Sequence, residues 1–180
     1  MIRTTIALTS LLFAASAGAQ TVTYGWEDGN TTLGQYGDIN PSNISDPAYV
    51  HSGNSALQLV DDQDSGTPQA YIAVITDLND GDVIDASFFR YDDTPGTAPS
   101  ARIWGHYISD ANDIDSYSGS AGGNYDYGEG LGWDETSYEW TFDADGGANA
   151  GLVIEVRTYS NPGDTVWIDD LTITTVETAT

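Results

Sequence analysis

The sequence of 180 residues contains no cysteine and no lysine, and its only cationic side chains besides histidine are 4 arginines. The lack of cysteine excludes a disulfide framework and a cysteine-ligated zinc site. Against these 4 cations stand 28 Asp and Glu residues, which give a formal net charge of −24. Because so acidic a surface repels the phosphates of nucleic acids and anionic membranes, we exclude both as partners.

Long apolar runs are absent apart from one near the N-terminus. Arg3 precedes an apolar stretch at 6–13, and the small residues AGA follow at 17–19. This order of charge, apolar core and small residues is typical of a signal peptide. The stretch is far shorter than the ~20 residues of a membrane-spanning helix. We therefore predict a signal peptide at 1–19 and a protein secreted to the extracellular space or the periplasm.

The remainder of the chain lacks the apolar period of a helix. Short runs rich in β-branched and aromatic residues recur instead, bounded by Gly, Asp, Asn or Pro. They predict strands at 22–26, 49–51, 56–60, 69–75, 83–91, 101–108, 138–142, 152–157 and 165–174. Many short strands separated by turns indicate an all-β sandwich or barrel. We expect a single domain at 20–174, followed by a polar tail at 175–180.

The last predicted strand changes phase in its middle. Apolar residues alternate along 165–168 and again along 171–174, but the two alternations differ by one residue at Asp169-Asp170. Such a slip indicates a β-bulge, where the backbone bends and a side chain is re-aimed. Two carboxylates at a bend, in a chain with so few cations, predict a bound metal ion, and calcium suits them best.

Four short motifs occur in a fixed order along the chain. They are WEDG at 26–29, HSGNSALQL at 51–59, LNDGD at 78–82 and VWIDDL at 166–171. In this order they resemble the jelly-roll carbohydrate-binding modules appended to bacterial xylanases and glucanases. The resemblance spans nearly the whole chain after the leader. It implies an antiparallel two-sheet β-sandwich of jelly-roll type, although this sandwich also serves adhesion, spacing and catalysis.

The resemblance also implies a structural calcium ion shared by the first and last strands. Its ligands would be the Glu27 side chain, backbone carbonyls near Gly25 and Gly53, and Asp169 or Asp170. Carboxylate and carbonyl oxygens are the ligands that calcium prefers. In the alternative interpretation, the two aspartates are solvated residues at a sheet edge.

A sugar-binding face is predicted on the strand at 101–108. Arg102, Trp104 and His106 alternate, so their side chains share one face, while Ile103 and Tyr107 point the other way. An indole between hydrogen-bonding groups suits a pyranose, which has both apolar faces and hydroxyls. In the alternative interpretation, Trp104 belongs to the core and His106 is a buried histidine with its hydrogen bonds satisfied.

Further rings lie in and after the segment 109–133, where Asp, Ser, Gly and Tyr dominate. We expect a long loop without regular structure there, and such loops are usually functional or disordered. We add to the predicted binding surface Tyr125, Tyr127, Trp133, Tyr138 and Trp140. Alternatively, these rings cover one end of the sandwich.

Catalysis is left open, and no residue is assigned a catalytic role. Glu129, Asp134, Glu135 and Glu139 are the first suspects for a glycosidase, but the distance between carboxylates decides that chemistry. A lyase would combine His106, Arg102 and a tyrosine. The sequence contains no nucleophile elbow, zinc motif or phosphate loop.

The predicted function is non-catalytic binding of a neutral polysaccharide by a secreted domain with a structural calcium ion. The acidic surface disfavours anionic chains, which favours β-glucans, xylans or similar neutral polymers. Two alternatives remain, namely a secreted surface or matrix protein and a small polysaccharide lyase or glycosidase. The sequence leaves the oligomeric state open.

Overall fold

The computed structural model describes residues 3–6, 19–93, 100–128, 131–159 and 161–177. Its strands are β1 (Arg3–Ile6), β2 (Gln20–Tyr24), β3 (Gly34–Tyr36), β4 (Ile39–Ile44), β5 (Ala56–Asp61), β6 (Gln69–Thr76), β7 (Val83–Asp92), β8 (Ser100–Asp110), β9 (Asp113–Gly123), β10 (Gly132–Thr141), β11 (Gly151–Tyr159) and β12 (Asp164–Val176). A single 3-10 turn, η1 (Asp145–Gly147), is the only helical element of the described residues. Within them, no helix is long and apolar enough to span a membrane.

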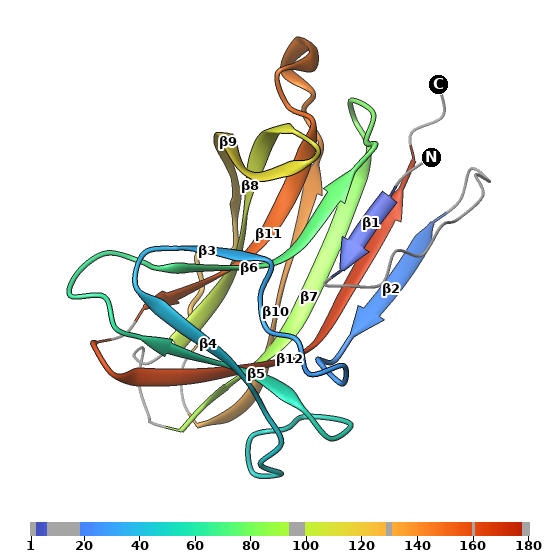
Figure 1. Cartoon of the computed structure of the whole chain (residues 1–180). Coiled ribbons are helices and arrows are strands. Elements are labelled where there is room, and N and C mark those ends of the chain that lie inside the picture. The colour runs from blue at the N-terminus through green and yellow to red at the C-terminus, as the bar shows by residue number, and fades with distance from the viewer. Residues whose placement is uncertain (1–2, 7–18, 94–99, 129–130, 160, 178–180) are drawn as a thin grey trace.

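The strands form two antiparallel sheets that pack face to face (Figure 1). The first sheet has the order β1-β6-β11-β8-β9, and β3 also pairs with β6. The second has the order β10-β7-β12-β5-β4, and β2 also pairs with β12. This arrangement confirms the predicted all-β, two-sheet sandwich.

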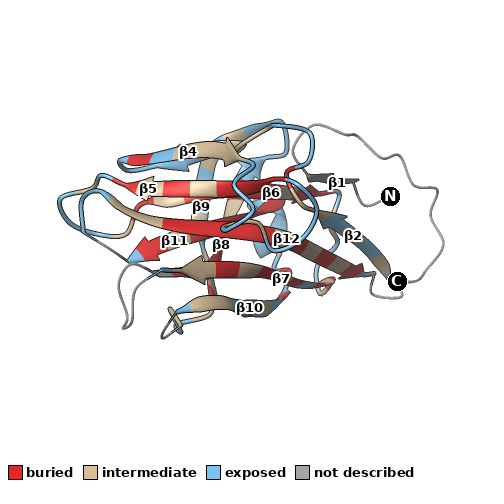
Figure 2. Ribbon diagram, turned by 90° about the horizontal axis from the view of Figure 1, so that it is seen from below, coloured by how far each residue is buried: buried red, intermediate tan, exposed pale blue. Residues whose placement is uncertain are grey.

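The core lies between the sheets because alternate residues of each strand point inward. Ile72, Ile103 and Ile154 of the first sheet are buried together with Phe88 and Ile168 of the second. Figure 2 shows buried residues along β5, β6 and β12, with exposed residues mainly in the connections.

The predicted loop at 109–133 is largely wrong. β8 extends to Asp110, and β9 pairs with it in a hairpin that runs from Asp113 to Gly123. β9 is an edge strand with few buried side chains, so backbone hydrogen bonds hold it without an apolar alternation. Only 124–131 connects β9 to β10. The predicted strand at 49–51 is wrong as well, since these residues belong to the connection between β4 and β5.

The predicted bulge in the last strand is confirmed. The pairing of β12 with β7 shifts register between Asp169 and Thr172. Asp170 has a φ of +51°, a left-handed conformation that few non-glycine residues adopt. Because of this bulge, Ile168 and Leu171 both reach the core although they are three positions apart in the chain.

The first strand lies within the predicted signal peptide. β1 pairs with β6 from Ala73 to Thr76, next to the pairing of β3 with the start of β6. β2 begins at Gln20, the residue that follows the predicted cleavage point. Removal of a leader at 1–19 would take β1 away from this edge of β6 and leave β2 in place. The leader itself stays a prediction.

Replacing Ile103 tests the position of the core. Its side chain is 0% exposed, so Ile103→Ala is expected to lower the free energy of unfolding by about 2–5 kcal/mol through lost burial and a cavity. Urea unfolding followed by tryptophan fluorescence measures this change. The exposed Ser137→Ala in β10 is the control and should stay within about 0.5 kcal/mol of the parent. Equal midpoints for both variants would contradict this assignment of the core.

Candidate binding cleft

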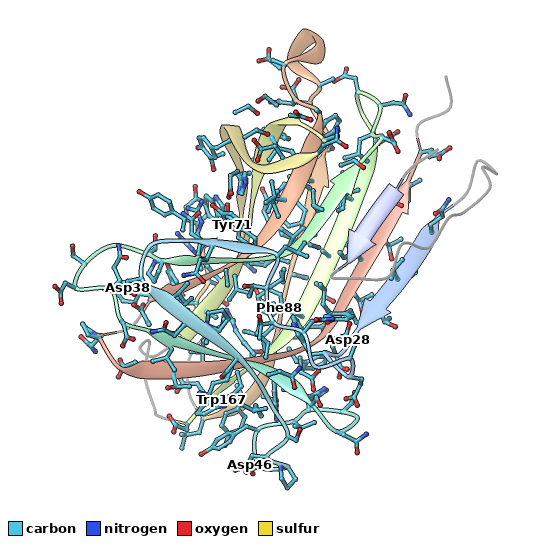
Figure 3. All side chains as sticks on the ribbon, in the orientation of Figure 1. Asp28, Asp38, Asp46, Tyr71, Phe88 and Trp167 are labelled. Carbon is cyan, nitrogen blue, oxygen red and sulfur yellow. The ribbon has the colours of Figure 1, made fainter. Side chains whose placement is uncertain are left out.

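A cleft of about 620 Å³ lies on the outer face of the first sheet. Its volume falls in the range of about 300–1,000 Å³ that small-molecule sites occupy. The lining residues come from β3, β6, β8, β9 and β11: Gln35, Tyr36, Gln69, Tyr71, His106, Ile114, Asp115, Tyr117, Ser120 and Arg157. A Cβ atom on Gly34 of β3 would contact both Tyr71 of β6 and Ile114 of β9, so these three strands converge at the cleft. Figure 3 labels Tyr71 at this place.

Side chains of β8 alternate between the two faces of the first sheet, as the sequence predicted. Arg102, Trp104 and His106 lie on the outer face of β8, while Ile103 is buried in the core and Tyr107 packs against it. His106 lines the cleft directly. The prediction that these three side chains share a face is therefore confirmed.

Trp104, however, is covered. The Arg102 guanidinium lies 4.5 Å from the centroid of the Trp104 ring, and the Arg157 guanidinium lies 4.7 Å from it. The indole Nε1 donates a hydrogen bond to Ser120 Oγ at 2.9 Å, and the residue is only 6% exposed. The ring therefore forms the base of this face and offers no open surface to a ligand.

Tyr125 and Tyr127 join this group as the sequence predicted. The Arg102 guanidinium lies 4.5 Å from the Tyr127 ring and 5.5 Å from the Tyr125 ring. Burial raises the pKa of Tyr127, and the nearby Arg102 and Arg157 charges partly oppose this. Tyr125 remains 77% exposed, so it adds an open ring beside the covered indole.

The floor of the cleft contains a buried ionic relay, formed by His106, Glu155 and Arg157, that the sequence reasoning missed. Glu155 of β11 is 0% exposed, and its Oε1 lies 2.5 Å from His106 Nδ1. Its Oε2 accepts a hydrogen bond from Arg157 Nε at 2.6 Å. Burial, followed by the Glu155 charge, raises the pKa of the adjacent Tyr71 to about 12. The signal in the sequence was a lone acid in an apolar strand, LVIEVR at 152–157.

Trp133, Tyr138 and Trp140 do not belong to the cleft, which corrects their predicted grouping with Arg102. They lie on β10, which pairs with β7 in the second sheet. Trp140 is 3% exposed in the core and donates from Nε1 to the Gly122 carbonyl at 3.1 Å, with Tyr138 packed beside it. The sequence could not show that 124–131 crosses from one sheet to the other.

Trp133 instead joins a second aromatic cluster on the outer face of the second sheet. Tyr49 stacks on Trp167 with ring centroids 3.9 Å apart and an interplanar angle of 4°. Tyr91 contacts both Trp167 and Trp133 edge to face. Trp133 also lies 5.1 Å from the His51 ring. These contacts hold the connection between β4 and β5 against the sheet.

The residues of the predicted metal site gather where β2 ends beside β12. Asp169 Oδ2 accepts hydrogen bonds from the backbone N–H groups of His51 and Ser52 at 2.9 and 3.1 Å. Asp170 Oδ1 accepts from Ser52 Oγ at 2.6 Å, and its Oδ2 lies 2.6 Å from His51 Nδ1. A Cβ atom on Gly25 would lie within 3.7 Å of an oxygen of each aspartate.

Glu27 reaches the same connection from the other side. Its Oε1 accepts from the backbone N–H groups of Asn54 and Ser55 at 2.7 and 2.9 Å, next to Gly53. These bonds lower the pKa of Glu27, whereas burial and, more weakly, the Asp170 charge raise the pKa of Asp169. The oxygen donors fit calcium chemistry. Even so, within the described part of the chain no three acidic or histidine side chains are drawn together as a ready-made metal cluster.

No protein-family model matches the sequence, and no curated protein matches it. Solved structures share its fold. The xylan-binding domain CBM22-1 from Paenibacillus barcinonensis has a TM-score of 0.57 at 14% identity, covering 92% of this chain and 100% of that one. The CBM22-2 xylan-binding domain of the same organism has a TM-score of 0.55 at 17% identity, covering 87% of this chain and 99% of that one. The enzymatically active domain of bacteriophage CBA120 tailspike protein 4 has a TM-score of 0.54 at 11% identity, covering 82% of this chain and 20% of that one.

At these identities the likeness establishes the fold. The chain has the jelly-roll β-sandwich fold of carbohydrate-binding modules, as its four ordered motifs implied. The tailspike likeness spans only a fifth of that chain, and it shows that the same sandwich also occurs within a protein with an enzymatically active domain.

Replacing Glu155 tests the buried relay. Glu155→Ala leaves Arg157 and His106 without their shared partner, and breaking a buried ion pair costs about 3–5 kcal/mol. Urea unfolding measures the loss. The exposed Glu139→Ala on β10 is the matched control and is expected to change stability by less than about 0.5 kcal/mol. A similar effect for both variants would show that the relay contributes nothing to stability.

Proposed function

We propose that the protein binds a neutral polysaccharide without catalysis, in the cleft on the outer face of the first sheet. The observation that carries this proposal is a cleft of about 620 Å³ whose lining combines tyrosine rings with side-chain amides and hydroxyls. Solved xylan-binding domains with the same fold support a polysaccharide as the ligand. Secretion, which the predicted signal peptide implies, would bring the protein into contact with such polymers.

The rings that remain open are the ones that can contact sugar. Tyr36 is 64% exposed and Tyr117 is 62% exposed, one on each side of the cleft. A flat aromatic ring desolvates the apolar face of a pyranose at little cost in conformational entropy. Gln35 and Gln69 also line the cleft, and side-chain amides can both donate to and accept from hydroxyl groups. Tyr125 extends the row of exposed rings beyond the cleft.

The charges at the cleft favour a neutral polymer. Arg157 is the cation that lines it, and its Nε already donates to the buried Glu155. Arg102 is enclosed by aromatic rings. Asp115 adds a negative charge to the lining, and the whole chain carries a formal net charge of −24. The negative charge of the chain therefore disfavours an anionic uronate.

We also propose that calcium binds at the junction of β2 and β12 in a structural role. The ligands would be Glu27, Asp169 or Asp170, and backbone carbonyls near Gly25 and Gly53. The Asp170 charge acts on both Glu27 and Asp169, and bound calcium would offset this repulsion. The ion would hold the segment between β4 and β5 against strands β2 and β12.

The polysaccharide proposal is tested by removing the open rings. Tyr117→Ala and Tyr36→Ala are each expected to weaken binding by about thirtyfold, since truncation of an aromatic anchor often costs 2 kcal/mol or more. Affinity electrophoresis against xylan, β-glucan and mannan, followed by calorimetry with oligosaccharides, measures the change. Trp133→Ala is the control, because its ring lies on the opposite sheet. Loss of binding in the control alone would place the site elsewhere, and no retention on any glycan would refute the proposal.

Calcium removal tests the metal proposal. At a hundredfold excess over its Kd, a ligand of the folded state adds about 2.7 kcal/mol to stability. The melting temperature is therefore expected to rise with calcium chloride and to fall again with EDTA. Asp169→Ala should abolish this response, while the exposed Asp85→Ala should keep it. A melting temperature that is unaffected by both calcium and chelator would overturn the proposal.

A further inference from the structure

His106 has one ring nitrogen without a partner. The side chain is 1% exposed, and its Nε2 atom is buried with no hydrogen-bond partner among the residues that the structure describes. Nearly all buried polar atoms in proteins are paired, and leaving one unpaired lowers stability. The residue lines the cleft, so the unmet hydrogen bond lies at the floor of the proposed sugar site.

Glu155 determines which ring nitrogen carries the hydrogen. Arg157 is permanently charged and donates to Glu155 Oε2 at 2.6 Å, so the two side chains form an ion pair. An ionised carboxylate only accepts hydrogen bonds, so His106 Nδ1, 2.5 Å from Oε1, must be the donor. In the neutral imidazole, Nε2 therefore holds a lone pair. The relay keeps the ring in one orientation and one tautomer.

We propose that His106 Nε2 is a specificity-determining group of the cleft, where it forms a hydrogen bond with one hydroxyl of a bound neutral sugar residue. This inference rests on the proposed function, and it assigns a recognition role to a side chain that is otherwise part of the buried relay. A hydroxyl suits the position because it donates to the neutral imidazole and accepts from the protonated one. A sugar without this hydroxyl leaves Nε2 unpaired and binds less tightly.

Tyr117 controls access to this atom. Two tyrosine rings pack against His106, with centroid distances of 4.9 Å for Tyr71 and 5.4 Å for Tyr117. Tyr71 is 7% exposed and held in place, whereas Tyr117 is 62% exposed on the edge strand β9. Exposed side chains change rotamer on the picosecond to nanosecond timescale. A ligand that turns Tyr117 aside reaches Nε2 and keeps the tyrosine ring as a wall of its own site.

A double-mutant cycle between protein and sugar tests the proposal. The neutral oligosaccharide that wild type binds best is compared by calorimetry with its monodeoxy analogues, for wild type and for His106→Phe. One analogue is expected to bind wild type about tenfold more weakly than the parent sugar. His106→Phe should bind that analogue and the parent equally well. If every deoxygenation costs the variant as much as it costs wild type, the proposal is overturned.

A measurement on wild type alone covers the case in which His106→Phe does not fold. Long-range 1H–15N correlation spectra report the state of each ring nitrogen, and the chain has 2 histidines, so His51 is an internal control. The parent oligosaccharide should move the His106 Nε2 resonance while that of His51 stays in place. An unmoved Nε2 resonance under saturating oligosaccharide overturns the proposal and leaves the binding function intact. If no oligosaccharide binds wild type, both proposals are refuted.

Discussion

The bulge at Asp169-Asp170 is the constraint on which the rest of the structure depends. β12 pairs with β2, β5 and β7, so its register sets the position of half the second sheet. Without the extra residue, one half of the strand would turn its apolar side chains to solvent. With it, both halves bury theirs, and the two carboxylates are aimed at His51 and Ser52. The same irregularity thus completes the core and brings Asp169 and Asp170 to the connection between β4 and β5.

The small number of cationic side chains determines how the polar groups of the interior are paired. Arg90 is 5% exposed and pairs with Asp134, Arg157 pairs with Glu155, and Arg102 is enclosed by rings. Arg90 and Arg157 are thus paired with carboxylates, whereas Arg102 stacks on aromatic rings and its Nε has no hydrogen-bond partner among the described residues. This distribution explains why an acidic protein can bury Glu155 at the floor of a cleft and still present a largely uncharged lining there.

The sequence predicted the local pattern well and the long-range arrangement poorly. Alternation placed Arg102, Trp104 and His106 on one face, and the phase slip located the bulge. The sequence left open whether Trp104 is buried, because the covering arginine Arg157 comes from β11, more than fifty positions away in the chain. Strand β9 was not predicted because an edge strand can be held by backbone pairing alone and then shows no apolar alternation in the sequence. Trp133 was misplaced because nothing local shows on which sheet the next strand lies.

Two aromatic surfaces on opposite sheets raise the question of which one suits a sugar. In the second cluster the rings contact one another, and Tyr49 lies flat on Trp167 at 3.9 Å. A ring face that another ring covers cannot desolvate a pyranose, so this cluster suits a structural role. At the cleft, Tyr36 and Tyr117 keep most of their surface open, while the neighbouring Trp104 indole is covered by guanidinium groups. The open rings of the cleft are therefore the ones that suit the proposed sugar ligand.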